Sequence, residues 1–89
     1  MANPLQPKII KLLKANGYLV INNHATAIGM RGVPDLLVIS PEGKMTFIEI
    51  KYGKDRLSEL QKYFIEELKK RNVSVIIARD VSDISELIN

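Results

Sequence analysis

Two acids and a lysine stand at strand-like positions near the middle of this 89-residue chain. Asp35 precedes a short apolar run, and Glu49 and Lys51 lie in the apolar stretch that follows the next turn. Successive side chains of a strand point to opposite faces, so Glu49 and Lys51 share one face of their strand. The spacing predicts a charged face on which one amine and one or two carboxylates can meet.

The turn at residues 40–44 decides which residue lies opposite Glu49. Its proline suits the first central position of a type I turn, and Gly43 suits the left-handed residue that closes a three-residue hairpin loop. This loop pairs residues whose numbers sum to 84, which places Asp35 across from Glu49. A two-residue loop would pair Asp35 with Ile50 instead and would separate the carboxylates.

Facing carboxylates can hold a divalent cation. Two of them at about 5 Å between Cβ atoms repel each other when both are buried and ionised, and a cation removes that conflict. Mg²⁺ or Mn²⁺ suits oxygen ligands better than zinc does. Lys51 beside the metal could orient a water molecule or neutralise phosphate charge. The alternative is a solvent-exposed hairpin face whose charges have no catalytic role.

Composition narrows the class of protein. The chain has no cysteine and a single histidine, His24, so it offers neither a disulfide framework nor a thiolate metal site. Its length suits one domain, residues 1–89, with a modest core. No apolar run approaches the roughly 20 residues that span a bilayer, and no signal-peptide pattern opens the chain. We therefore expect a soluble intracellular protein in the cytoplasm.

Positive charge is concentrated before Asp35. Residues 1–34 contain no acid, and the remainder nets −1. The basic residues of this segment are Lys8, Lys11, Lys14 and Arg31. They are candidate DNA contacts, the alternative being a solubilising helix face.

The first elements are a helix and a strand. Asn3 is expected to cap a helix that has Pro4 at its first helical position, and Asn16-Gly17 ends that helix. Residues 18–22 read as a strand, and residues 22–33 read as a loop.

Two loop residues are further candidate DNA contacts, because polar loop residues beside a site often bind ligands. They are His24 and Arg31. The alternatives are a surface histidine and a structural salt bridge between Arg31 and Asp35.

The second half of the chain predicts a β-α-β unit. A helix starts at Asp55 or Ser58 and ends near Arg71, and residues 73–78 read as a strand buried on both faces. Gln61 either completes a capping box with Ser58 or faces the cleft near the lysine. Asp83 is expected to cap a final helix, residues 84–88. The order is α-β-β-β-α-β-α, an α/β fold with a mixed sheet flanked by helices.

Three segments form a joint motif: Gly32-Val33-Pro34-Asp35, Glu49-Ile50-Lys51, and Leu57-Ser58 with Gln61. Together they resemble the PD-(D/E)XK nuclease superfamily. The likeness is greatest to stand-alone virus-type replication-repair nuclease (VRR-NUC) domains, and archaeal Holliday-junction resolvases are similar in architecture. The resemblance implies a restriction-endonuclease-like sheet and, for a phage protein, action in the host cytoplasm.

The resemblance also implies roles for individual residues. The metal ion, Mg²⁺ or Mn²⁺, would be bound by Asp35, Glu49 and the backbone carbonyl of Ile50. Lys51 would place the attacking water, and Gln61 would assist at the site. The implied activity is a metal-dependent, structure-selective DNA endonuclease that acts as a homodimer on branched DNA such as Holliday junctions.

One position departs from the family pattern. The family usually carries a glutamate on the first helix, and the nearest candidate here is Gln6, which could bind a metal only as a neutral ligand. The missing charge motivates an alternative, a DNA-binding module with a weakened or vestigial nuclease site. A second alternative is a purely structural domain.

Overall fold

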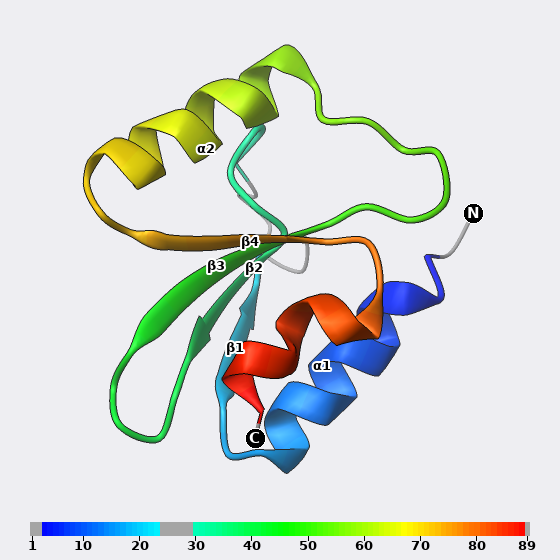
Figure 1. The fold of residues 1–89 in the computed structure, drawn as a ribbon, viewed down its shortest axis with the longest axis vertical. Helices are drawn as coiled ribbons and strands as arrows, with labels where there is room; N and C mark the ends of the chain where they lie inside the picture. The colour runs from blue at the N-terminus through cyan, green and yellow to red at the C-terminus, as the bar shows by residue number, and fades with distance from the viewer. Residues whose placement is uncertain (1–2, 24–29, 89) are drawn as a thin grey trace.

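A four-stranded mixed sheet carries helices on both faces (Figure 1). The computed structural model describes residues 3–23 and 30–88. Its elements are α1 (Leu5–Ala15), β1 (Leu19–Asn22), β2 (Leu36–Ile39), β3 (Met45–Ile50), α2 (Glu59–Lys70), β4 (Ser74–Ala78) and the 3₁₀ helix η2 (Val81–Leu87). The predicted α/β class and element order are confirmed. Across these described ranges no helix is both long and apolar enough to cross a membrane.

The strands lie in the order β1-β2-β3-β4. The first two pairings are antiparallel and β3 pairs with β4 in parallel, so α2 is the crossover of a β-α-β unit. Every β2–β3 pair sums to 84, from Leu36 with Ile48 to Ile39 with Met45. Gly43 has a φ of +90° in the turn between them, which confirms the three-residue loop.

Helix α1 begins as its sequence predicts. Asn3 Oδ1 accepts a hydrogen bond from the Leu5 N–H at 2.9 Å, and Pro4 has helical backbone angles. A side-chain oxygen placed in this way satisfies a backbone donor that has no partner within the helix. The apolar side of α1 then packs against the sheet.

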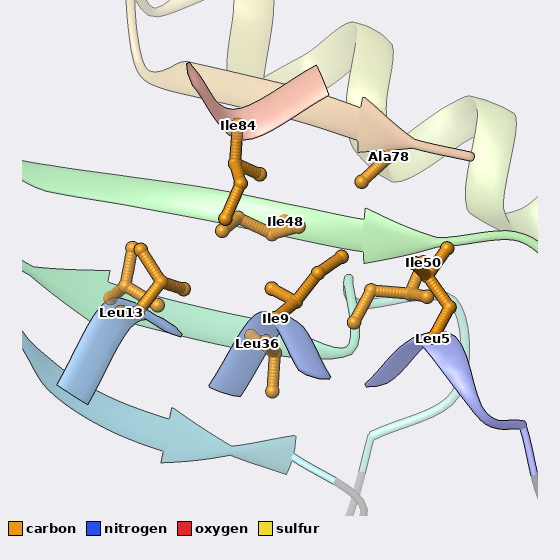
Figure 2. Packing of buried hydrophobic residues seen from close by; sticks show 9 residues of the cluster. Leu5, Ile9, Leu13, Leu36, Ile48, Ile50, Ala78 and Ile84 are labelled. Carbon is orange, nitrogen blue, oxygen red and sulfur yellow. The ribbon is translucent and has the colours of Figure 1, made fainter. Parts of the chain in front are cut away.

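The core lies between the sheet and the layer formed by α1 and η2 (Figure 2). Burial of each large aliphatic side chain contributes about 1.5–3 kcal/mol relative to exposure. The buried members of the cluster are Leu5, Ile9, Leu13, Leu36, Val38, Ile48, Ile50, Ala78 and Ile84. Helix α2 lies on the opposite face of the sheet (Figure 1). That second face carries Glu49, because Ile48 and Ile50 on either side of it point into the core.

Two predictions about the C-terminal part are wrong. Strand β4 is half-buried along most of its length, not buried on both faces, because it is an edge strand of the sheet. The final helix is a 3₁₀ helix that begins at Val81, and its cap is Asp80 rather than Asp83. Asp83 instead occupies the third helical position, where its side chain accepts from the Asp80 N–H at 3.1 Å. This reciprocal capping box places the start of the helix three residues earlier than expected.

Candidate active site

The predicted acids and lysine meet where β3 ends. Asp35 directly precedes β2, Glu49 is the penultimate residue of β3, and Lys51 directly follows that strand. Lys51 Nζ lies 3.3 Å from Glu49 Oε2. The exposed fractions are 8% for Asp35 and 1% for Glu49, so the alternative of a solvent-exposed hairpin face is wrong.

Asp35 is tied directly to β3. Its Oδ2 accepts a hydrogen bond from the Ile50 N–H at 2.8 Å. Asp35 is also the next residue after the β2–β3 ladder, whose register continues toward Glu49. The backbone of β3 therefore fixes one carboxylate beside the other.

The segment before Asp35 fits closely under α2. Gly32 has a φ of +82°, and a Cβ on it would lie 2.5 Å from Leu60 Cγ and 2.9 Å from Phe64 Cδ2. Only glycine combines this backbone conformation with this close approach. Pro34, two residues after Gly32, is fully buried. Gly32 and Pro34 thus place Asp35 relative to α2.

Gln61 fulfils both roles that its sequence position allows. Its Oε1 accepts from the Ser58 N–H at 2.8 Å, and its own N–H donates to Ser58 Oγ at 3.1 Å, which completes the capping box. Its Nε2 donates to Glu49 Oε2 at 3.1 Å. The cap holds the amide oxygen, so the amide NH₂ group faces the acid.

Burial raises the pKa of Glu49 from its ordinary value of 4.5 to about 7. The negative charge of Asp35 adds to the rise, and the Lys51 ammonium group opposes it. Glu49 Oε2 accepts from both Lys51 and Gln61, whereas Glu49 Oε1 is buried with no hydrogen-bond partner among the described residues. A buried oxygen of this kind costs free energy until something binds it.

The donors fit a hard divalent cation. Asp35 and Glu49 offer carboxylate oxygens, and Mg²⁺ commonly uses one or two carboxylates with water and substrate phosphate as its other ligands. Within residues 3–23 and 30–88, no group of three His, Cys, Asp or Glu side chains is placed to hold a metal. Asp35 and Glu49 would therefore supply all the negative charge that this part of the chain brings to the cation.

Gln6 lies in a groove along α1 rather than on the sheet. The groove has a volume of about 590 Å³ and is lined by Asn3, Gln6, Pro7, Ile10, Lys11, Lys14 and Asn22. Asn22 pairs with Leu36, and the N–H of Asn23 donates to the backbone oxygen of Asp35 at 2.9 Å. One end of the groove thus lies near the backbone of Asp35.

The predicted DNA contacts lie in different places. Lys11 and Lys14 line the groove. Lys8 lies near Asp80, whose pKa is lowered chiefly by the Ser82 hydroxyl group and slightly by the charge of Lys8.

The two loop candidates have different outcomes. Arg31 is exposed and forms no ion pair with a described residue, so the predicted alternative of a structural salt bridge is wrong. His24 lies outside the described residues.

Sequence reasoning missed one residue that supports this end of the sheet. Arg79 follows β4, and its Nη1 donates to the backbone oxygen of Asp55 at 2.9 Å. The two residues are 24 positions apart, and no local pattern links a strand-end arginine to a carbonyl in a remote loop.

Two comparisons with known proteins find the same family. The family model of the VRR-NUC domain matches residues 8–81. A solved structure titled "VRR_NUC domain" is similar at 29% sequence identity, with a TM-score of 0.77 over 92% of this chain and 87% of that chain. No curated protein sequence matches. The chain therefore belongs to the VRR-NUC family, whose domains are DNA-processing nucleases.

Proposed function

We propose that this domain is a Mg²⁺- or Mn²⁺-dependent endonuclease that hydrolyses phosphodiester bonds in branched DNA, such as Holliday junctions, as a homodimer. One observation carries the metal dependence. Glu49 has one oxygen held by Lys51 and Gln61 and a second that is buried, unpartnered among the described residues and close to the charge of Asp35. A divalent cation would satisfy that oxygen and offset both negative charges.

Three groups would hold the metal: the Asp35 and Glu49 carboxylates and the Ile50 carbonyl. The N–H and C=O of one strand residue face the same neighbouring strand, and the Ile50 N–H already donates to Asp35. The Ile50 carbonyl would therefore also be directed toward Asp35. Gln6, in the groove along α1, would be a further, neutral ligand. A bound Mg²⁺ supplies a water of lowered pKa and stabilises charge on the phosphate.

Lys51 is the proposed catalytic lysine. Only 12% of its side chain is exposed, and its ammonium group is held near Glu49. A cation fixed in this way can orient a water molecule against the scissile phosphate and stabilise the charge that develops on it. Gln61 would keep Glu49 in place while that happens.

The open sheet face supports the homodimer. We give this name to six apolar residues that align across three strands on the side of the sheet that also carries α2. They are Leu19, Ile39 and Met45 in one row, and Ile21, Leu37 and Phe47 in the next. Leu19 is 59% exposed and Met45 is 53% exposed. Aligned apolar side chains left in water are typical of a protein interface, and a second copy would cover them.

Basic residues support DNA as the partner. Lys11 and Lys14 in the groove, together with Lys8 and Arg31, give positive charge on a segment that has no acid. His24 remains a candidate from its sequence position. Cations of this kind bind phosphates and make affinity salt-dependent.

The test is cleavage of a four-way junction and of linear duplex, each with and without Mg²⁺. We expect metal-dependent cleavage that favours the junction, and we expect Lys51→Ala to reduce the rate by about 10²–10³-fold. Lys62→Ala is the matched control, because Lys62 is an exposed lysine of α2 paired with Glu59. If Lys51→Ala cleaves as fast as Lys62→Ala, the proposed mechanism is wrong.

A DNA-binding module with a weakened site is the second candidate. It is favoured by the neutral Gln6 in place of an acid and by the lack of a third metal-binding side chain among the described residues. Calorimetry distinguishes the two functions. Absence of Mg²⁺ and Mn²⁺ binding, combined with salt-dependent DNA affinity, would favour the module.

A further inference from the structure

The connection between Lys51 and Ser58 is exposed and carries both an aromatic ring and positive charge. We call residues 52–57 the arch. Figure 1 shows it as the long green connection that extends away from the sheet before α2 begins. Tyr52 at its start is 51% exposed, and Lys54 and Arg56 are exposed as well. Nothing in the proposed cleavage chemistry uses these side chains.

The arch is held at its base and near its middle. At the base, the Lys51 N–H donates to the Ala78 oxygen at 2.9 Å. Within the arch, the Asp55 N–H donates to the Tyr52 oxygen at 3.2 Å. Arg79 holds the same turn from outside through its bond to the Asp55 oxygen at 2.9 Å. The arch therefore presents its side chains from a supported backbone.

The cations of the arch have no partners in the described part of the chain. Neither Lys54 nor Arg56 forms an ion pair or a side-chain hydrogen bond there. By contrast, a glutamate pairs with each of Lys62 and Lys70 on α2 and with Arg71 directly after it. An exposed ring next to two unpaired cations matches the chemistry that binds unpaired nucleotides. Aromatic rings stack on bases, and cations hold the phosphates of the same strand.

The two residues that flank the arch contact or support Glu49. The arch starts directly after Lys51, which pairs with Glu49, and ends directly before Ser58, whose backbone orients the Gln61 amide. Six extended residues span at most about 22 Å, so every arch side chain stays within a few nucleotides of a phosphate held at the site. A strand bound at Glu49 therefore has nucleotides within reach of the arch.

We infer that the arch binds the unpaired nucleotides next to the cleaved bond: Tyr52 stacks on a base, and Lys54 and Arg56 hold the flanking phosphates. Arg79 is a positioning residue that supports the arch without touching DNA. The inference rests on the proposed nuclease function. It assigns to the arch a preference for branched DNA that carries unpaired nucleotides, because duplex bases are already stacked and offer Tyr52 no free face.

The test is DNA affinity of the full chain in EDTA, measured by fluorescence anisotropy on single-stranded oligothymidylate, blunt duplex and a four-way junction. We expect Tyr52→Ala to weaken single-strand binding by about 5- to 150-fold, as loss of one stacked base does, and to affect duplex binding little. Tyr52→Phe should keep the parent affinity, because it keeps the ring. Tyr63→Ala is the control, since Tyr63 on α2 is 57% exposed.

Two further variants separate phosphate contact from support of the arch. The double variant Lys54→Ala/Arg56→Ala should make the plot of log affinity against log salt less steep on single strands, by about 1.4 in the magnitude of its slope. Arg79→Ala should speed hydrogen exchange of the Asp55 amide and weaken single-strand binding, and Arg79→Lys should restore both in part.

The outcomes separate the arch from the proposed function. If Tyr52→Ala and the Lys54/Arg56 double variant bind all three DNAs with the parent's affinity and the parent cleaves junctions with Mg²⁺, the arch inference is overturned and the nuclease proposal stands. If the parent neither binds nor cleaves any of the DNAs, both are overturned.

Discussion

Gln61 holds Glu49 with one end of its amide group and caps α2 with the other. The nitrogen donates to Glu49 Oε2 at 3.1 Å, and the oxygen accepts from the Ser58 N–H at 2.8 Å. The start of the helix thus sets the orientation of a side chain in the site. A structural role and the proposed catalytic role coincide in Gln61, and substitutions can separate them.

Gln61→Glu should impair cleavage without removing the cap. A glutamate can still accept from the Ser58 N–H, but it would bring a third carboxylate toward Glu49 in place of a donor. We expect the cleavage rate to fall by about 10–100-fold with little change in Tm. Ser58→Ala is the matched variant: it should cost about 0.5–2 kcal/mol of stability and leave the rate nearly intact. Cleavage assays and thermal melts of both variants check this, and a fully active Gln61→Glu would contradict it.

The stability of the metal-free protein should fall as pH rises from 4.5 to about 7. Over that window folded Glu49, with its pKa raised to about 7, keeps a proton that the unfolded chain releases near 4.5. The folded state therefore binds more protons, and the free energy of unfolding decreases with rising pH. Urea unfolding in EDTA across this range measures the slope.

Glu49→Gln is the control for that slope. This substitution should flatten the dependence of the free energy of unfolding on pH and raise stability above pH 7. It should also abolish any rise in Tm on adding Mg²⁺. Glu66→Gln, an exposed acid on α2, should behave as the parent. A slope that survives in Glu49→Gln would assign the titration to another group.

Local patterns in the sequence predicted the β2–β3 register and the cap of α2. Gly43 and its turn set the β2–β3 pairing, and Ser58 set the start of α2, because each depends on residues within a few positions of one another. The spacing of Asp35, Glu49 and Lys51 singled out the acids, and the family motif strengthened that prediction. The close approach of Gly32 to Leu60 and the bond from Arg79 to the Asp55 oxygen join distant segments, so only the folded chain shows them.

The error at the final helix had a local cause. Both Asp80 and Asp83 can cap a helix, and the structure uses Asp80 at the cap and Asp83 in the first turn. Sequence spacing alone did not choose between them. Strand β4 was misjudged for a different reason, because an apolar run does not show whether its strand is central or at the edge of the sheet.

Gly32→Ala should destabilise the fold more than Gly43→Ala does. Both glycines have positive φ, so each substitution should cost about 1–2 kcal/mol in backbone strain. At Gly43 nothing lies within 4 Å of the added methyl group, whereas at Gly32 it meets Leu60 Cγ at 2.5 Å. The clash should add about 1–3 kcal/mol and displace α2 from Asp35. Urea unfolding compares the two variants, and equal losses would show that the approach to α2 does not constrain residue 32.

The open sheet face should mediate dimerisation. The double variant Leu19→Lys/Ile21→Lys places two charges on the β1 part of the open sheet face. A stable dimer interface buries at least about 1,000 Å². Burial of two unpaired charges in that interface would strongly destabilise the dimer. We expect the parent to be a dimer and the double variant a monomer by analytical ultracentrifugation. Junction cleavage should fall while the thermal melt changes little, because these side chains pack against little in one subunit. Tyr63→Lys, at an equally exposed position on α2, should remain dimeric. If the Leu19/Ile21 variant also remains a dimer, the interface lies elsewhere on the molecule.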